Sequence, residues 1–117
     1  MSINASRVRW DNRREVTSIT LGSLAWVAIG SPLLVQPRLI KVYNNTDADI
    51  DLSTVPIDGE EQDFVALKSG FVYDFTNNAS SQAGYLHLNE GDTLYAKAHA
   101  APSTGSLYFI CVFAANY

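Results

Sequence analysis

Short runs of apolar and β-branched residues, separated by turn-forming residues, follow one another along most of this chain. The runs cover residues 16–21, 24–29, 38–44, 48–55, 70–76, 85–88, 93–99 and 106–114. Turn residues stand between them, as at Gly30-Ser31-Pro32 and Asp58-Gly59. No window of helical length carries apolar residues at i, i+3, i+4 and i+7, and residues 59–62 are the best place for a single helical turn. The pattern predicts an all-β fold, either an antiparallel sandwich or a barrel.

Alternation within the runs predicts which residues face the core. Leu94, Ala96 and Ala98 fall on one side of their run, and Phe71, Tyr73 and Phe75 fall on one side of theirs. The last run is apolar on both sides. A strand of that kind lies in the middle of a sheet, or another subunit covers it, and the sequence leaves both open. One side of it holds Leu107, Phe109, Cys111 and Phe113, and the other holds Tyr108, Ile110 and Val112.

Residues 1–15 show no apolar period and are predicted to form an extended N-terminal arm, followed by a β-sandwich domain over residues 16–117. The length of 117 residues fits one such domain. The arm carries four arginines against Asp11 and Glu15, a balance of +2, whereas the remaining residues carry four basic against ten acidic side chains, a balance of −6. A basic arm on an acidic body can dock on an acidic surface of a neighbour or on nucleic acid.

The stretch NNTDADIDLS, residues 44–53, raises the question of a metal site. Asp47, Asp49 and Asp51 stand at alternate positions. Side chains two apart on a strand are separated by roughly 6.5–7 Å, so three of them on a flat strand cannot close on one calcium ion. The intervening Ala48, Ile50 and Leu52 make an apolar row. The aspartates are therefore predicted to be the solvent side of an amphipathic strand.

No other motif supports catalysis or a cofactor. His87 and His99 lack the spacing of metal ligands, the single cysteine Cys111 lies in an apolar run, and the carboxylates of residues 58–63 suit a solvated turn. Nucleophile elbows and glycine-rich phosphate loops are missing from the sequence. These observations predict a protein that is not an enzyme and binds no cofactor. No apolar run is long enough to span a membrane. A dedicated nucleic-acid site is not expected either, because the folded body is acidic and repels phosphate.

The order of motifs after Pro37 resembles a class of small structural proteins from the virions of tailed bacteriophages. The similar segments are RLIKVYNNTDADIDLS (38–53), DFVALKSGFVYDFTNN (63–78), LHLNEGDTLYAKA (86–98) and PSTGSLYFICVFA (102–114). The resemblance implies a jelly-roll-like antiparallel β-sandwich. It also implies a capsid decoration or cement protein, assembled in the host cytoplasm and bound to the major capsid protein or to neighbouring virion subunits as a homo-oligomer. A head–tail connector, collar or tail adaptor ring is the alternative.

In that role, partner contacts would come from the basic arm and from the second apolar side of the last run. The expected partner-binding residues are Arg7, Arg9, Trp10, Arg13, Arg14, Tyr108, Ile110 and Val112. A different class of function, a carbohydrate-binding β-sandwich, would use aromatic stacking surfaces at Trp26, Tyr73, Tyr85 and Tyr95. A hydrolase is the third hypothesis.

Overall fold

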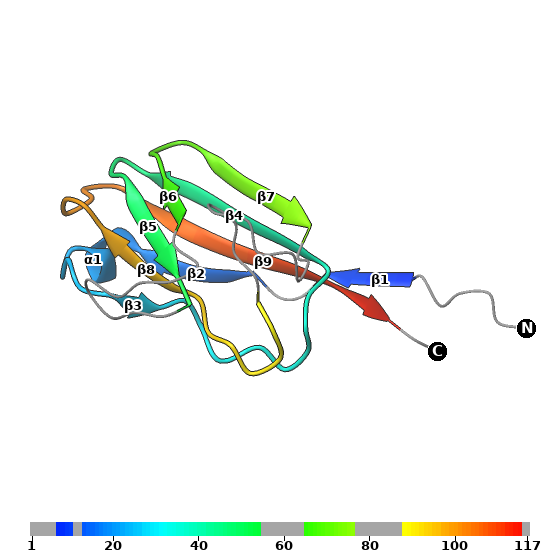
Figure 1. Ribbon diagram of the computed structural model, residues 1–117. Helices are drawn as coiled ribbons and strands as arrows, with labels where there is room; N and C mark the ends of the chain where they lie inside the picture. The colour runs from blue at the N-terminus through cyan, green and yellow to red at the C-terminus, as the bar shows by residue number, and fades with distance from the viewer. Residues whose placement is uncertain (1–6, 11–12, 55–64, 77–87, 116–117) are drawn as a thin grey trace, which may run out of the picture.

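The computed structural model describes residues 7–10, 13–54, 65–76 and 88–115, which form two packed antiparallel β-sheets (Figure 1). The strands are β1 (Arg7–Trp10), β2 (Arg14–Thr17), β3 (Val27–Ala28), β4 (Leu39–Thr46), β5 (Ile50–Ser53), β6 (Val65–Leu67), β7 (Val72–Thr76), β8 (Tyr95–Ala98) and β9 (Gly105–Ala115), and the one described helix, α1, is the single turn Ser18–Leu21.

The first sheet, sheet A, contains five strands, and the second, sheet B, contains four. In sheet A, β1 and β2 both pair with β9, which pairs with β4, which pairs with β7. Sheet B has the order β3, β8, β5, β6. The chain repeatedly passes from one sheet to the other, for example between β4 and β5 and between β8 and β9, as in jelly-roll sandwiches. The predicted all-β sandwich is confirmed.

Strand β9 organises sheet A. It pairs with β4 over eight residues, from Thr46 opposite Gly105 to Leu39 opposite Val112. Its other edge pairs with β2 near the start and with β1 near the end. The double-sided apolar character of this strand therefore reflects, first of all, a central position in the sheet.

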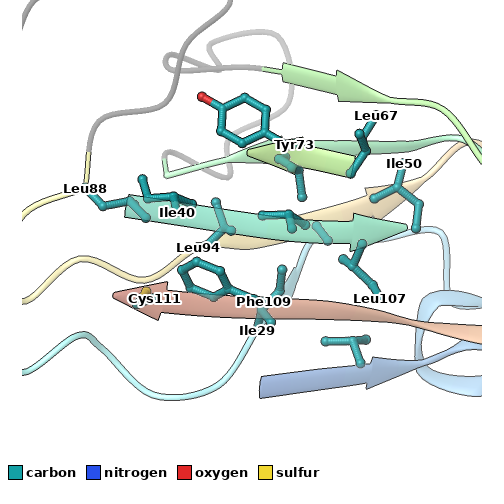
Figure 2. Close-up of a cluster of buried hydrophobic side chains, with 14 of the residues drawn as sticks. Ile29, Ile40, Ile50, Leu67, Tyr73, Leu88, Leu94, Leu107, Phe109 and Cys111 are labelled. Carbon is teal, nitrogen blue, oxygen red and sulfur yellow. The ribbon is translucent and has the colours of Figure 1, made fainter. Parts of the chain in front are cut away.

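Side chains of the two sheets meet in one hydrophobic core (Figure 2). Every second residue of β4 and β8 is buried, which is the periodicity expected of strands with one face in the core. Burying each large apolar side chain contributes roughly 1.5–3 kcal/mol relative to leaving it exposed. Residues from both sheets that face one another include Ile40, Phe109 and Leu107 of sheet A and Ile50 and Leu67 of sheet B.

The structure corrects several predicted elements. The first two residues of the predicted strand at 16–21 belong to β2 and the other four form the helical turn α1, and the run at 24–29 contributes only the two residues of β3. Strand β6 was missed, because three residues are too few to show an alternation. Phe71 does not face the core with Tyr73: it precedes β7 and is 61% exposed. The predictions for residues 59–62 and for most of 85–88 lie outside the described residues.

The predicted division into an arm of residues 1–15 and a domain of residues 16–117 also changes, because both β1 and β2 belong to sheet A. The predicted boundary falls inside β2, whose Val16 is buried in the core. Long-range pairing with β9 makes strands of two segments that are too short and too charged to show a strand pattern by themselves.

Candidate functional site

The expected partner-binding residues of the arm divide between two strands and the segment that joins them. Arg7, Arg9 and Trp10 are in β1, which runs antiparallel to the last residues of β9, with Arg7 opposite Ala115 and Trp10 opposite Val112. Beyond Val112, β9 has no pairing with β4. The paired segments β1 and β9 therefore extend past the first residue of β4, and β1 lies at one end of the described molecule (Figure 1).

Arg13 and Arg14 lie next to each other but differ in their contacts. The guanidinium of the exposed Arg13 lies over the ring of Tyr108, 4.4 Å from its centroid. Arg14 is half-buried, and its guanidinium lies 5.8 Å from the centroid of Phe109. A side-chain carbon placed on Gly30 would meet Arg14 Cδ at 2.5 Å, so Arg14 packs closely on that turn. Arg14 is part of the sandwich, whereas Arg13 remains available to a ligand or partner.

The outer face of sheet A carries a groove of about 400 Å³. It brings together residues of β4, β7, β9 and the loop before β7, and its lining includes Arg13, Tyr43, Asn45, Phe71, Tyr108 and Ile110. We call it the outer groove. Tyr43, Tyr108 and Ile110 are half-buried there, and Phe71 is largely exposed. The groove thus brings Arg13 of the expected arm contact together with Tyr108 and Ile110 of the expected second surface. Val112 is only 2% exposed and offers no surface to a partner.

Each of the three aspartates accepts a hydrogen bond from a different part of the chain. Asp47 accepts from the N–H and the hydroxyl of Ser103. Asp49 Oδ1 accepts from the N–H of Ser69 at 3.0 Å, and Asp51 Oδ1 lies 2.8 Å from His99 Nε2. The aspartates therefore hold neighbouring loops against the β4–β5 connection.

The geometry around these aspartates bears out part of the sequence interpretation. The buried positions of Ala48, Ile50 and Leu52 confirm the predicted apolar row. Asp47 and Asp49, however, belong to the loop before β5 and not to a strand. Among the residues that the structure describes, no group of three or more His, Cys, Asp or Glu side chains could hold a metal ion.

The sequence analysis missed a buried polar cluster at the end of β4. Asn44 is 1% exposed, and its side-chain amide donates to the carbonyls of Ala48 at 2.9 Å and Leu67 at 3.0 Å. Its side-chain oxygen accepts from the N–H and hydroxyl of Thr46. Because Leu67 belongs to β6, this amide joins the two sheets. The Asn-Asn-Thr run gives a turn signal in the sequence, which hid its place inside a strand.

The other candidate residues do not form a site. The single cysteine, Cys111, is fully buried in β9. Of the proposed sugar-stacking residues, Tyr73 is 3% exposed in the core, while Tyr95 and Trp26 are half-buried in or near sheet B. Tyr85, His87 and the acidic residues 58–63 lie outside the described residues. Helix α1, with four residues, is too short to cross a membrane, and the described part contains no helix that could.

Comparisons with known proteins give one informative match. No family model and no curated protein matches the sequence. The fold is similar to a solved structure from work on Bacillus endospore appendages, which are described there as a novel family of disulfide-linked pili. The TM-score is 0.52 at 15% sequence identity, and the match covers 97% of this chain and 96% of that chain. At this identity the match shows a shared fold.

This match corrects the function expected from the motif order. The structural neighbour is a pilus protein, and not a phage capsid protein, so the expected role as a capsid decoration or head–tail connector protein is wrong. The described parts of the segments that suggested it are strands and turns of a β-sandwich, and a shared fold does not by itself imply a shared function.

Proposed function

We propose that this chain is a non-enzymatic structural subunit that associates with further copies of itself to build an extended, repeating assembly. The observation that carries the proposal is the architecture of sheet A. Among the described strands, β7 at one edge pairs only with β4, and β1 at the other edge pairs only with β9. Within the described part of the chain, both edges therefore present backbone groups without a strand partner, and such groups are ready templates for pairing with another chain.

The two open edges differ from each other, and this difference favours an open assembly. A contact between two unlike surfaces is heterologous and can be repeated from copy to copy without closing. An isolated two-stranded ribbon is also only marginally stable in water, so the segment of β1 and β9 that extends past β4 gains from a neighbour. The pilus protein with a similar fold supports the same kind of role.

Copies of this chain would be held together without disulfides. The only cysteine in the 117 residues is Cys111, which is fully buried within a central strand. A disulfide between two folded copies would require that strand to leave the core. Folded copies of this chain therefore cannot form disulfides with one another of the kind named for the structural neighbour.

The proposal is tested by measuring the mass and shape of the purified full chain over a range of concentrations, with light scattering and electron microscopy. We expect a mass that rises with concentration and elongated particles. A variant lacking residues 1–12 is the companion protein. It keeps β2 and the core residue Val16, so its far-UV circular dichroism should stay that of a β-sandwich while assembly is lost.

Two outcomes would refute the proposal. One is a full chain that stays monomeric at every concentration. The other is a closed dimer or small ring whose mass no longer increases, because heterologous contacts that close into a ring do not build an extended assembly.

A further inference from the structure

The open edge of β7 has backbone groups that point away from the sandwich. In an antiparallel pair, hydrogen-bonded and non-hydrogen-bonded residue pairs alternate. The Asn44 N–H donates to the Phe71 carbonyl at 3.0 Å, which makes the neighbouring pair Tyr43–Val72 a non-hydrogen-bonded one. The pairs Lys41–Asp74 and Leu39–Thr76, two and four residues further along β7, are also non-hydrogen-bonded. The N–H and C=O groups of Val72, Asp74 and Thr76 therefore face outward.

This edge is the longest continuous open edge of the described sheets. The edge strands of sheet B, β3 and β6, have two and three residues, while β7 has five. Natural proteins protect exposed edges with charged side chains, especially lysine, and with proline, bulges or very short strands. Strand β7 carries one charged residue, Asp74. The sequence of β7, VYDFT, contains neither lysine nor proline, and its pairing with β4 runs through five consecutive residues without a bulge.

The surface next to this edge is apolar. Phe71 is 61% exposed and Val72 is 52% exposed, and both also line the outer groove. An additional strand beside β7 would place its side chains over these two residues and remove them from water. Each large apolar side chain that is fully covered contributes roughly 1.5–3 kcal/mol.

Strand β1 has the properties of a matching strand. It has four residues against the five of β7, and among the described strands it pairs with β9 alone, which leaves its second edge open. Its sequence, RVRW, brings two arginines, while β7 brings Asp74, whose side chain is 53% exposed. Opposite charges on adjacent strands stabilise pairing, and like charges oppose it.

From these observations we infer that the β7 edge of one copy pairs with β1 of a second copy, so that sheet A continues from subunit to subunit. The inference rests on the proposed function and names its contact. Because β1 pairs with the part of β9 that extends past β4, the next copy is displaced along the strands. Repetition of this displacement lengthens the assembly in one direction.

The test compares two substitutions of the same residue in the full chain, Asp74→Pro and Asp74→Ala. Both remove the carboxylate and its contact with Lys41 Nζ at 3.5 Å. Proline in addition removes the outward N–H and places its ring on the open edge, while the bonds to β4 remain. We expect Asp74→Ala, which loses only the attraction to the arginines of β1, to assemble within about fivefold of the unchanged chain. Asp74→Pro should assemble at least a further tenfold less at the same concentration.

Amide hydrogen exchange gives a second measurement that needs no variant. In the unassembled chain the amides of Val72 and Asp74 face solvent, and pairing with β1 should slow their exchange at least tenfold in the assembled form. If circular dichroism shows that Asp74→Pro fails to fold, this measurement still tests whether β7 pairs with β1 of a second copy.

The outcomes separate the inference from the proposed function. Assembly of a folded Asp74→Pro variant at the unchanged level, or unprotected Val72 and Asp74 amides in assembled material, would overturn the β7–β1 contact and leave self-assembly standing. Protection of these amides that persists in assemblies lacking residues 1–12 would assign the edge to a different strand. A full chain that never assembles would refute the proposed function itself.

Discussion

A single buried amide, that of Asn44, connects the two layers of this sandwich. It satisfies carbonyls in the β4–β5 loop and in β6, and it accepts hydrogen bonds from Thr46. Thr46 Oγ1 continues the cluster to Ala48, and Ser69 Oγ donates to the Thr46 carbonyl at 2.6 Å. Buried polar groups are costly unless they are paired, so this cluster fixes one geometry for the corner at which β4, β5 and β6 meet.

Asn44→Ala should lower the free energy of unfolding by about 2–4 kcal/mol, because two buried carbonyls lose their donor and a small cavity remains. Denaturant unfolding followed by tryptophan fluorescence measures the change. The neighbouring Asn45 is exposed, and Asn45→Ala should change the stability by no more than about 0.5 kcal/mol. Equal effects of the two substitutions would contradict the role of Asn44.

Asp47 makes part of the stability depend on pH. Hydrogen bonds from the Ser103 hydroxyl and N–H hold the pKa of Asp47 below its ordinary value of 3.8. A carboxyl group whose pKa is lowered by folding stabilises the folded state above the unfolded pKa, and this contribution is lost as the pH falls through the folded pKa.

Asp47→Asn should therefore lower the melting temperature most at neutral pH, and the difference from the unchanged protein should shrink below pH 3.8. Thermal unfolding across a pH series measures this. Ser103→Ala, which removes only the hydroxyl donor, should show a smaller effect of the same sign. A difference between Asp47→Asn and the unchanged protein that is constant with pH would contradict the interpretation.

At the scale of elements, the start of β9 depends on a close approach between two backbones. Gly105 has a φ of +85°, and a Cβ atom at this position would lie 1.8 Å from the carbonyl oxygen of Asn45. The same residue is opposite Thr46 in the β4–β9 register. Glycine is required here both for the backbone conformation and for the space.

Gly105→Ala should destabilise the fold by roughly 2–5 kcal/mol, because the left-handed conformation and the backbone overlap each add a cost. Gly91 provides a matched control: its φ is +89°, but nothing lies within 4 Å of a Cβ atom there. Gly91→Ala should cost only about 1–2 kcal/mol. Similar unfolding midpoints for the two variants would show that the contact with Asn45 relaxes easily.

At the scale of the whole molecule, the proposed assembly should be indifferent to reductants. Because Cys111 is buried in the core, it should form no disulfide between copies. Neither dithiothreitol nor Cys111→Ala should therefore dissociate assembled copies. Light scattering before and after reduction measures this, and electrophoresis without reductant should show the monomer mass alone. Covalent ladders that disappear on reduction would mean that Cys111 leaves the core on assembly.

Much of the sandwich could be predicted from the chain because local alternation is a property of neighbouring residues. The buried rows Leu94, Ala96, Ala98 and Leu107, Phe109, Cys111 follow from a period of two. Strand β6 and the helical turn α1 were not predictable in this way, because three or four residues do not establish a period. The outer groove itself was not predictable, because Arg13 meets Tyr108 and Ile110 only through long-range strand pairing, and Val112 of the same strand is buried.

The sequence by itself determined that the chain forms short strands, which faces of most of them are apolar, and that it has a single cysteine and no familiar catalytic motif. Only the tertiary structure decided that the arginine-rich start pairs with β9, that Asn44 joins the sheets, and that β7 pairs with no described strand other than β4. The physical reason is range. Alternation arises between adjacent residues, whereas edges, registers and grooves arise from segments far apart in the chain, whose pairing no local pattern records.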